Sequence, residues 1–460
     1  MTKNFFKKIS LFAALKWSTV FVFLGIVLWG FPDSPSPWFD NGINLGLAKT
    51  FVSDGIYSLR LGPGSYIMQP SLFISTNYPL IGWIILSFWI FGIGLWQAQI
   101  IMVIFLSLFL LLTYRLVLKL NNGNKILSLA SVALVATFLP FYGHGLSGGL
   151  GEIPGLVYLF AALLIYNRKE RLMVVVAGFL FGLAATTKVI YFTVFAGVLV
   201  AEIWQAWRNR KIPYERWCLL VLGALPTVLM WGWSLLPHPL TREYLVQTFT
   251  YYHNPYKADS SFVLSNLKKF VTETTPIHFS ILMGTVLSAF FIPKRSQKYG
   301  DNFTYIYQVL LVFAGLNWLW FLETPGWYRY FFPAHIVALV LFPGACFWVC
   351  QQIKQTVLKK YAAGFIIISL ILVQFVYVLQ ERNKHLYFNP EPRRLVADLE
   401  QWIGANADIY FLDQPELWFL WKGDNARQFI HMNAHVNFGE DFFATGHLPS
   451  YLVTGNHPED

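Results

Sequence analysis

Long apolar segments separated by short polar stretches run along most of the chain. A transmembrane helix needs about 20 mostly apolar residues, because the hydrocarbon core of a bilayer is about 30 Å thick. About eleven segments meet or approach this length, namely 11–30, 96–118, 126–143, 152–167, 171–187, 189–206, 216–236, 276–293, 303–321, 328–350 and 361–380. The pattern predicts an all-α polytopic membrane protein with about eleven transmembrane helices.

Basic residues between these segments predict their orientation. The clusters are Lys3/Lys7/Lys8, Lys119/Lys125, Arg168/Lys169/Arg171, Arg208/Arg210/Lys211, Lys294/Arg295/Lys298 and Lys354/Lys359/Lys360. Such clusters stay on the cytoplasmic side, so an even number of crossings must separate successive clusters. The predicted spans meet this condition from Lys119 onward. They also meet it between Lys8 and Lys119 if the apolar segment 79–94 dips into the outer leaflet instead of crossing. In the alternative, 79–94 crosses the membrane and the first helix has the opposite orientation.

The two ends of the chain differ in character. The basic stretch Met1–Lys8 and the apolar segment after it resemble a signal peptide, but no small-residue cleavage site follows. We therefore expect an uncleaved signal anchor that crosses from inside to outside. The tail from Glu381 is polar and predicts a small α/β fold. Its expected elements are helix 392–404, strand 408–413, the segment Pro415–Lys422, and strands 427–431 and 450–454.

These patterns divide the chain into two predicted domains. Residues 1–380 form the transmembrane domain, and its first outer loop, 31–95, carries juxtamembrane helices. Residues 381–460 form a small extracytoplasmic α/β domain. A domain of this size holds only a modest core, so we expect it to lean on the transmembrane domain.

Composition agrees with a membrane protein and excludes several other classes. The 460 residues are 56% hydrophobic and 13% charged, against about 25% charged in soluble domains. The net charge of +10 does not indicate nucleic-acid binding, because the basic residues lie in small clusters between spans. The three cysteines lie in apolar segments and are interpreted as buried thiols. Zinc spacings, a nucleophile elbow and a phosphate-binding Gly-Lys-Ser loop are absent from the sequence, which argues against an ATPase or a serine hydrolase.

Asp40 is the first candidate for chemistry. It lies just after the first apolar segment, in Trp38-Phe39-Asp40-Asn41-Gly42, where a carboxylate is hard to explain by packing. One interpretation is a general base, strengthened by an apolar surround that raises its pKa. The alternative is an N-cap for a helix over 41–53.

Lys188 and Arg329 are basic residues that the topology places on the outer side, against the charge bias. A lone Lys between apolar runs usually snorkels to the interface, but a phosphate partner would also explain it. Arg329 presents a fork of donors suited to phosphate oxygens. It lies in Glu323-Thr324-Pro325-Gly326-Trp327-Tyr328-Arg329-Tyr330, whose aromatic residues are typical of an interfacial belt.

Glu152 follows the glycine-rich stretch Gly143–Gly151 and begins a predicted helix. A carboxylate there suits the positive end of the helix dipole, so capping and ligand binding both remain open. The glycines themselves favour a tight turn between helices. Tyr78-Pro79 opens the dipping segment, where Pro is normal at a helix start.

Together these residues resemble the C-type glycosyltransferase superfamily (GT-C), and within it the branch of protein O-mannosyltransferases and lipid A aminoarabinose transferases. The resemblance covers about the first 340 residues. Its motifs are Asp40 with Gly55-Ile56-Tyr57, Tyr78-Pro79-Leu80, Ser147–Glu152 with Gly182–Lys188, and Arg329-Tyr330 with Pro333. The chain departs from the family at Asn41, where many relatives have a second acid, and at Asn77-Tyr78, where many have His-Pro.

The resemblance implies an inverting glycosyltransferase that moves a sugar from a polyprenyl-phosphate donor to a hydroxyl of a lipid, glycan or protein. It implies Asp40 as the catalytic residue, and Arg329, Lys188 and Tyr330 as donor-phosphate ligands. Acceptor or sugar binding is assigned to Glu152, Trp38, Tyr78, Trp327 and Glu323. No metal ligand is assigned, and a divalent metal is left open.

The expected location is a bacterial plasma membrane, with the active site and the C-terminus outside and no nucleic-acid partner. Two alternatives are a flippase for lipid-linked sugars and a non-catalytic scaffold. Transporters commonly carry inverted repeats and mid-membrane charges, and the sequence shows neither.

Overall fold

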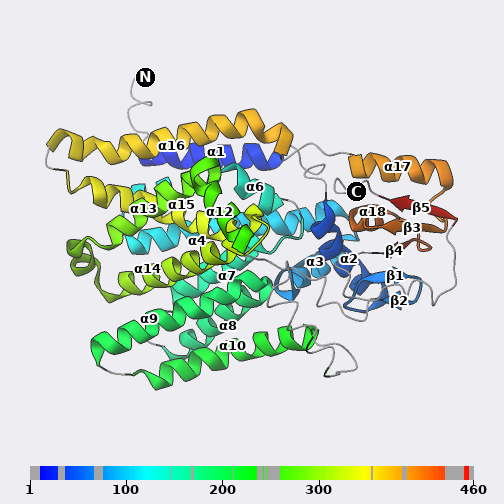
Figure 1. Cartoon of the computed structure of the whole chain (residues 1–460), viewed down its shortest axis with the longest axis horizontal. Coiled ribbons are helices and arrows are strands. Elements are labelled where there is room, and N and C mark those ends of the chain that lie inside the picture. Colours follow the sequence, from blue (N-terminus) through cyan, green and yellow to red (C-terminus); the bar gives the residue numbers. More distant parts are fainter. Residues whose placement is uncertain are drawn as a thin grey trace, which may run out of the picture.

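The structure is a computed structural model (Figure 1) that describes residues 11–29, 37–66, 76–146, 148–166, 170–210, 212–235, 242, 246, 260–353, 356–385, 391–429 and 450–454. Most of these residues are helical. The helices of the bundle are α1 (Leu11–Leu28), α4 (Leu95–Leu120), α5 (Lys125–Ala136), α6 (Leu139–Leu146), α7 (Glu152–Ile165), α8 (Arg171–Thr187), α9 (Thr193–Asn209), α10 (Tyr214–Leu235), α12 (Ser260–Thr272), α13 (Thr274–Phe290), α14 (Pro293–Leu322), α15 (Tyr328–Cys350) and α16 (Thr356–His385).

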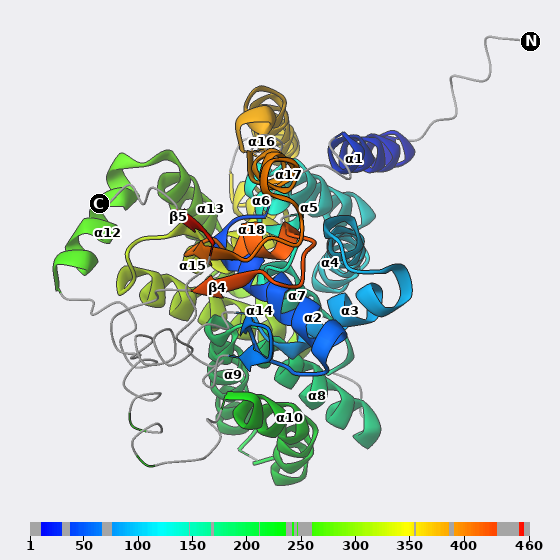
Figure 2. The same ribbon diagram turned by 90° about the vertical axis from the view of Figure 1, so that its right-hand side faces the viewer.

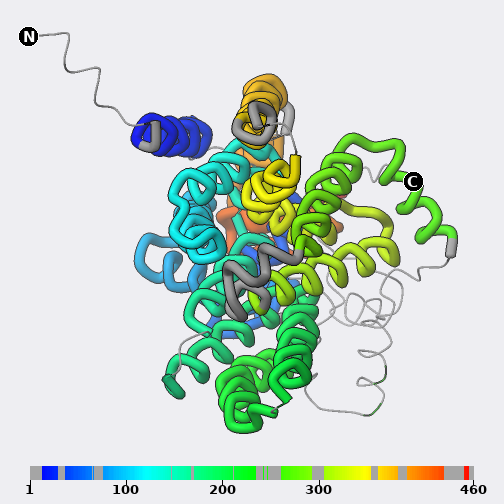
Figure 3. Tube along the Cα trace, turned by 90° about the vertical axis from the view of Figure 1, so that its left-hand side faces the viewer, coloured from blue at the N-terminus to red at the C-terminus, as the bar shows by residue number. Residues whose placement is uncertain are grey.

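Each predicted span coincides with a helix or a helix pair of this bundle, which Figure 3 shows end-on. Among the described residues, six helices are long and apolar enough to cross a membrane, and the bent pair α5 and α6, at 66°, makes a seventh candidate. The helices α1, α7, α8 and α13 are apolar but shorter. The chain is therefore a multi-pass membrane protein, as predicted.

The helix α15 forms the centre of the bundle. Every residue from Phe331 to Cys346 is buried, because α15 packs against α5, α13 and α14. The hydroxyl of Ser131 on α5 donates to the carbonyl oxygen of Val340 at 2.8 Å. Cys346 and Cys350 are buried as predicted, whereas Cys218 on α10 is exposed.

A second group of elements lies at one end of the bundle (Figure 1). It contains α2 (Phe39–Asp54), the hairpin β1 (Arg60–Gly62) and β2 (Ser65–Tyr66), and α3 (Tyr78–Phe91). The C-terminal elements α17 (Glu391–Ile403), β3 (Ile409–Leu412), α18 (Pro415–Leu420), β4 (Arg427–Phe429) and β5 (Tyr451–Thr454) lie there too. The three strands form a parallel sheet in the order β4-β3-β5.

These C-terminal elements match the predicted helix and strands to within about two residues. They have their own hydrophobic cluster around Phe411, Trp418 and Trp421. The helix α16 continues to His385, past the predicted domain boundary at residue 380. The segment 79–94 becomes α3, which lies beside α2 at the end of the bundle (Figure 1), and its dip into a leaflet stays a prediction.

Helix α18 is docked along α2, as Figure 2 shows from the end of the bundle. A side chain at Gly42 would collide with the backbone of Pro415 and Glu416, so only glycine allows this approach. One turn later, the ring of Trp418 packs on Gly46.

The far end of α18 is fixed by a cation. The ammonium of Lys49 donates to the carbonyl oxygens of Trp418, Phe419 and Trp421 at 3.3, 3.2 and 2.8 Å. It thereby satisfies the last carbonyls of a helix, where positive charge is favourable. The ring of Phe419 also stacks on Phe88 of α3, with centroids 6.2 Å apart. The C-terminal elements therefore lean on α2 and α3, as the size of the tail predicted.

Candidate functional site

Asp40 lies in the first turn of α2 and forms an ion pair with Arg329, the second residue of α15. The guanidinium donates from Nη1 to the Oδ2 atom of the carboxylate. Both side chains are largely buried, with 12% and 13% of their surface exposed. The interpretation of Asp40 as an N-cap is wrong, because the helix starts one residue earlier and Trp38 occupies the cap position.

Three aromatic rings surround the Arg329 guanidinium. Its Cζ atom lies 4.4 Å from the ring centroid of Trp327, 5.2 Å from Tyr330 and 5.8 Å from Trp38. The rings of Trp327 and Tyr330 are stacked on each other. The faces of aromatic rings attract cations, so these rings hold the guanidinium in place. We call the guanidinium and its three rings the Arg329 box. Trp38 and Trp327 are themselves exposed, so the Arg329 box is open to the surroundings.

Glu152 and Lys188 form a second ion pair, buried more deeply than the first. Glu152 begins α7 and is fully buried, and Lys188 follows the last residue of α8 with 4% exposed. Its ammonium donates to Oε1 of Glu152, and the hydroxyl of Tyr191 donates to the backbone carbonyl of Glu152. The snorkelling expected of a lone Lys is not seen, because Lys188 has this internal partner.

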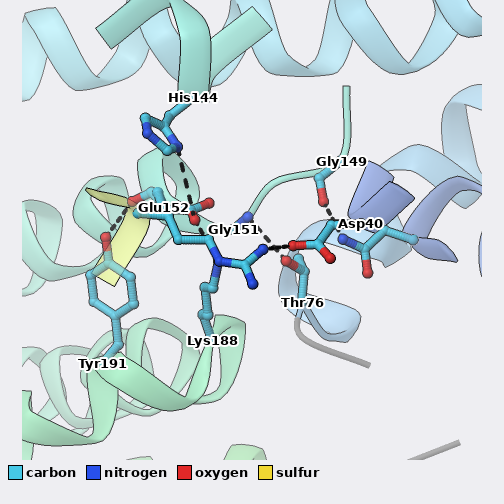
Figure 4. Close-up of polar contacts among 10 residues, drawn as sticks. Asp40, Thr76, His144, Gly149, Gly151, Glu152, Lys188 and Tyr191 are labelled. Atoms are coloured by element: carbon cyan, nitrogen blue, oxygen red, sulfur yellow. Dashed lines mark hydrogen bonds and ion pairs between the residues drawn. The ribbon is translucent and has the colours of Figure 1, made fainter. Parts of the chain in front are cut away.

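The turn 148–151, called the glycine turn below, joins the two ion pairs. Figure 4 shows Asp40, Glu152 and Lys188 together with Gly149 and Gly151 of this turn. The side-chain amide of Asn44, one turn after Asp40, donates to the carbonyl of Gly149 at 2.8 Å. The backbone N–H of Gly151 donates to the hydroxyl of Thr76 at 3.1 Å. Glu152 follows directly, so the turn that starts α7 is fixed against α2.

His144 provides a second connection. Its Nδ1 atom lies 4.0 Å from Oε1 of Glu152. Its ring packs on Phe332 and Tyr328, with centroids 4.5 and 5.8 Å apart, and these two residues flank Arg329 along α15. Glu152 and Arg329 therefore approach the same region from α7 and α15.

The remaining predicted site residues are Tyr78 and Glu323. The hydroxyl of Tyr78 donates to the carbonyl of Thr227 on α10 at 2.9 Å, so it ties α3 to α10. Glu323 is exposed at the C-cap of α14. Within the described ranges, no hydrogen bond or ion pair links its carboxylate to Asp40 or Glu152. The acceptor or sugar roles of Tyr78 and Glu323 stay predictions.

Some features of the site were outside sequence reasoning. Asn44 and Asn41 carry no motif, although both are fully buried beside Asp40. His335 is fully buried, and its ring nitrogens bond the hydroxyl of Tyr328 at 3.0 Å and Nδ1 of His278 at 2.9 Å. This network supports the first turns of α15, where Arg329 lies.

The part of the chain that the structure describes holds no group of three His, Cys, Asp or Glu residues that could bind a metal ion. The two carboxylates of the site, Asp40 and Glu152, each face a cationic side chain.

Comparison with solved structures shows which known fold this chain shares. No family model and no curated protein matches the chain. ArnT from Cupriavidus metallidurans, solved with bound undecaprenyl phosphate, superposes with a TM-score of 0.59 at 13% identity over 95% of this chain and 90% of that chain. An oligosaccharyltransferase from Archaeoglobus fulgidus gives a TM-score of 0.56 at 13% identity, over 93% of this chain and 65% of that one.

AglB from Archaeoglobus fulgidus, in complex with an inhibitory peptide and a dolichol-phosphate, is similar with a TM-score of 0.51 at 14% identity. The superposition covers 87% of this chain and 58% of AglB. ArnT is a lipid A aminoarabinose transferase, and both it and AglB are GT-C glycosyltransferases. The predicted resemblance and the predicted helical class are confirmed: this chain has the GT-C fold.

Proposed function

From the GT-C fold as premise, we propose that the chain is an inverting glycosyltransferase that uses a polyprenyl-phosphate sugar as donor and a hydroxyl as acceptor. The pairing of Asp40 with Arg329 carries this proposal. It places the residue suited to take a proton beside the residue suited to bind a phosphate. The structural neighbours add support, since ArnT was solved with bound undecaprenyl phosphate and AglB with a dolichol-phosphate.

The reaction needs one displacement at the anomeric carbon. The acceptor oxygen forms a bond to that carbon while the bond from the carbon to the phosphate oxygen breaks. Asp40 takes the proton of the acceptor hydroxyl, and the lipid phosphate leaves with both electrons of the broken bond. A single displacement inverts the configuration of the sugar. Arg329 stabilises the charge that develops on the leaving phosphate, and Trp327 and Tyr330 keep its guanidinium in position.

The ion pair also provides an order of events. While Asp40 is bound to Arg329, the cation stabilises the carboxylate and makes it a weaker base. The phosphodiester of the donor offers Arg329 a bidentate anionic partner, and its charge grows as the bond to the sugar breaks. The phosphate then takes over the guanidinium and frees Asp40 for the acceptor. Activation of the base would thus require a bound donor.

Lys188 is the second cation near the site, and we assign it to the donor phosphate together with Arg329 and Tyr330. Its ammonium is already paired with Glu152, so Glu152 and the donor phosphate would share it. The pair keeps positive charge buried near the site without leaving it unpaired. Glu152 holds Lys188 in position and keeps one carboxylate oxygen for another partner.

The proposed setting is a bacterial plasma membrane, with the end of the bundle that carries α2 and the C-terminal elements facing outside. The distribution of basic clusters supports this orientation. The donor would arrive within the lipid, and the acceptor, a hydroxyl of a lipid, glycan or protein, from the outer side.

Purified protein in nanodiscs tests this function. The protein is incubated with a panel of radiolabelled undecaprenyl-phosphate sugars and with candidate acceptors from an envelope extract. The proposal predicts radiolabelled acceptor and an equal amount of free undecaprenyl phosphate. Movement of an intact sugar lipid across vesicles without cleavage would favour a flippase. Neither transfer nor movement with any donor would favour a scaffold.

A further inference from the structure

Asn41 is the most unusual buried polar residue beside the proposed base. Its side chain is fully buried, and neither its amide nitrogen nor its amide oxygen has a hydrogen-bond partner among the described residues. Buried polar groups in native proteins are almost always bonded, so an exception needs an explanation such as a bound molecule. The side chain directly follows the proposed catalytic residue Asp40 in the first turn of α2.

Helical periodicity shows where Asn41 points. Residues three and four positions apart share a face of a helix, so Asn41 shares a face with Asn44 and Leu45. Asn44 bonds the carbonyl of Gly149, and the side chain of Leu45 also packs against Gly149. Asn41 therefore lies on the face of α2 that meets the glycine turn.

The same region holds two more buried acceptors without a partner. The Oδ1 atom of Asn44 and the Oε2 atom of Glu152 have none within the described part of the chain. Glu152 comes directly after the glycine turn, and its other oxygen is paired with Lys188. Figure 4 shows the Asp40 and Glu152 side chains on either side of this turn.

These atoms define the chemistry of the missing partner. Three oxygens can only accept hydrogen bonds, and the amide nitrogen of Asn41 is the one donor among them. A matching ligand must therefore supply several donors, as the hydroxyl groups of a sugar ring do. A carboxylate supplies no donors, so a ligand that placed one here would leave these oxygens unbonded.

We propose that Asn41, Asn44 and Glu152 form the subsite for the sugar ring of the donor, and that this subsite selects sugars without negative charge. The inference rests on the proposed function. Depth supports the donor sugar over the acceptor, because all three side chains are fully buried while the Arg329 box remains open. The sugar ring then lies between α2 and the start of α7, and its phosphate lies at Arg329.

Binding measurements separate this subsite from the phosphate site. Asn41→Leu should weaken binding of undecaprenyl-phosphate sugar by about 10- to 100-fold, the effect of losing a few hydrogen bonds. Binding of undecaprenyl phosphate without a sugar should not change. Arg329→Gln should weaken both. Equal loss of both lipids in Asn41→Leu, or no loss of either, would overturn the subsite.

The melting temperature distinguishes a ligand-binding asparagine from a structural one, because replacing a structural asparagine would lower it. Replacing an unbonded buried amide by an apolar group of similar size removes a cost, so Asn41→Leu should melt at the same temperature as wild type or higher. Asn266 is the matched control, since its buried amide donates to the carbonyls of Phe321, Leu322 and Thr324. Asn266→Leu should melt lower. A comparable drop for Asn41→Leu would contradict the proposal.

A donor panel tests the selectivity. Undecaprenyl phosphate linked to a neutral hexose, to an amino sugar and to a hexuronic acid is offered to wild type and to Glu152→Gln. We expect wild type to bind the neutral or the amino sugar and to reject the uronate, and Glu152→Gln to accept the uronate better. Preference of wild type for the uronate would overturn the selectivity. Loss of transfer from every donor, with binding as predicted, would instead count against the proposed function.

Discussion

Asp40 on α2 and Arg329 on α15 are ion partners although 289 positions separate them in the chain. One comes from the short helix that follows the first span, and the other from the first turn of the most buried helix of the bundle. Their contact holds a carboxylate and a guanidinium together at the end of the bundle where the C-terminal elements dock. The proposed chemistry depends on this contact forming and then opening.

Arg329 should be needed for its shape as well as its charge. We expect Arg329→Gln to lower kcat/KM for transfer by about 100-fold or more, the usual effect of removing one donor to a developing charge. Arg329→Lys keeps the charge but loses the planar fork, so it should fall between wild type and Gln. Transfer by Arg329→Gln within about twofold of wild type would remove the residue from the phosphate site.

For the buried pair of Glu152 and Lys188, removing one partner should destabilise the protein more than removing both. Lys188→Met leaves a carboxylate without its partner and should lower the free energy of unfolding by about 3–5 kcal/mol. The double variant Glu152→Gln/Lys188→Met removes both charges and should recover most of that loss. Thermal unfolding in detergent measures both. If the double variant is as unstable as Lys188→Met, the pair is not what stabilises this region.

The membrane helices could be predicted because each segment that crosses a lipid bilayer must be apolar over a sufficient length, independently of its neighbours. The tail could be predicted for a similar reason, since its strands and helix carry their own local periodicity. The bend between α5 and α6 was not predicted, because the segment 126–143 reads as one continuous apolar run.

The contacts of the site follow a different rule. The sequence indicated Asp40, Lys188 and Arg329 because each charge is costly near lipid. It did not show that Lys188 pairs with Glu152 or Arg329 with Asp40, because these contacts depend on how distant helices pack. The roles of Gly42, Lys49 and Asn41 also depend on neighbours brought by the fold, so a single sequence carries no signal for them.

Gly42 should be required for docking of α18. An added Cβ at this position collides with the backbone of Glu416, which cannot move aside as a side chain can. We expect Gly42→Ala to increase hydrogen exchange in residues 415–420 and to lower activity. Gly82→Ala on α3 is the matched control, because nothing lies within 4 Å of its added Cβ. Equal exchange in both variants would show that the close approach does not matter.

The same docking contact should depend on pH. Burial raises the pKa of Glu416 to about 7 from its ordinary value of 4.5. Between these values the folded state holds the proton more tightly than the unfolded state, so stability falls as pH rises from about 4.5 to about 7 and then levels off. The loss is at most about 3 kcal/mol. Unfolding between pH 4.5 and 8 should show this slope in wild type, and Glu416→Gln should reduce it.

Sugar transfer by Asp40→Asn tests the central claim most directly. The variant keeps the size of the side chain but cannot take the acceptor proton. With purified protein of normal yield and melting temperature, we expect donor binding to be retained and transfer to fall by about 10²- to 10⁴-fold. Transfer at close to the wild-type rate would contradict the account, because Asp40 would then not be the base.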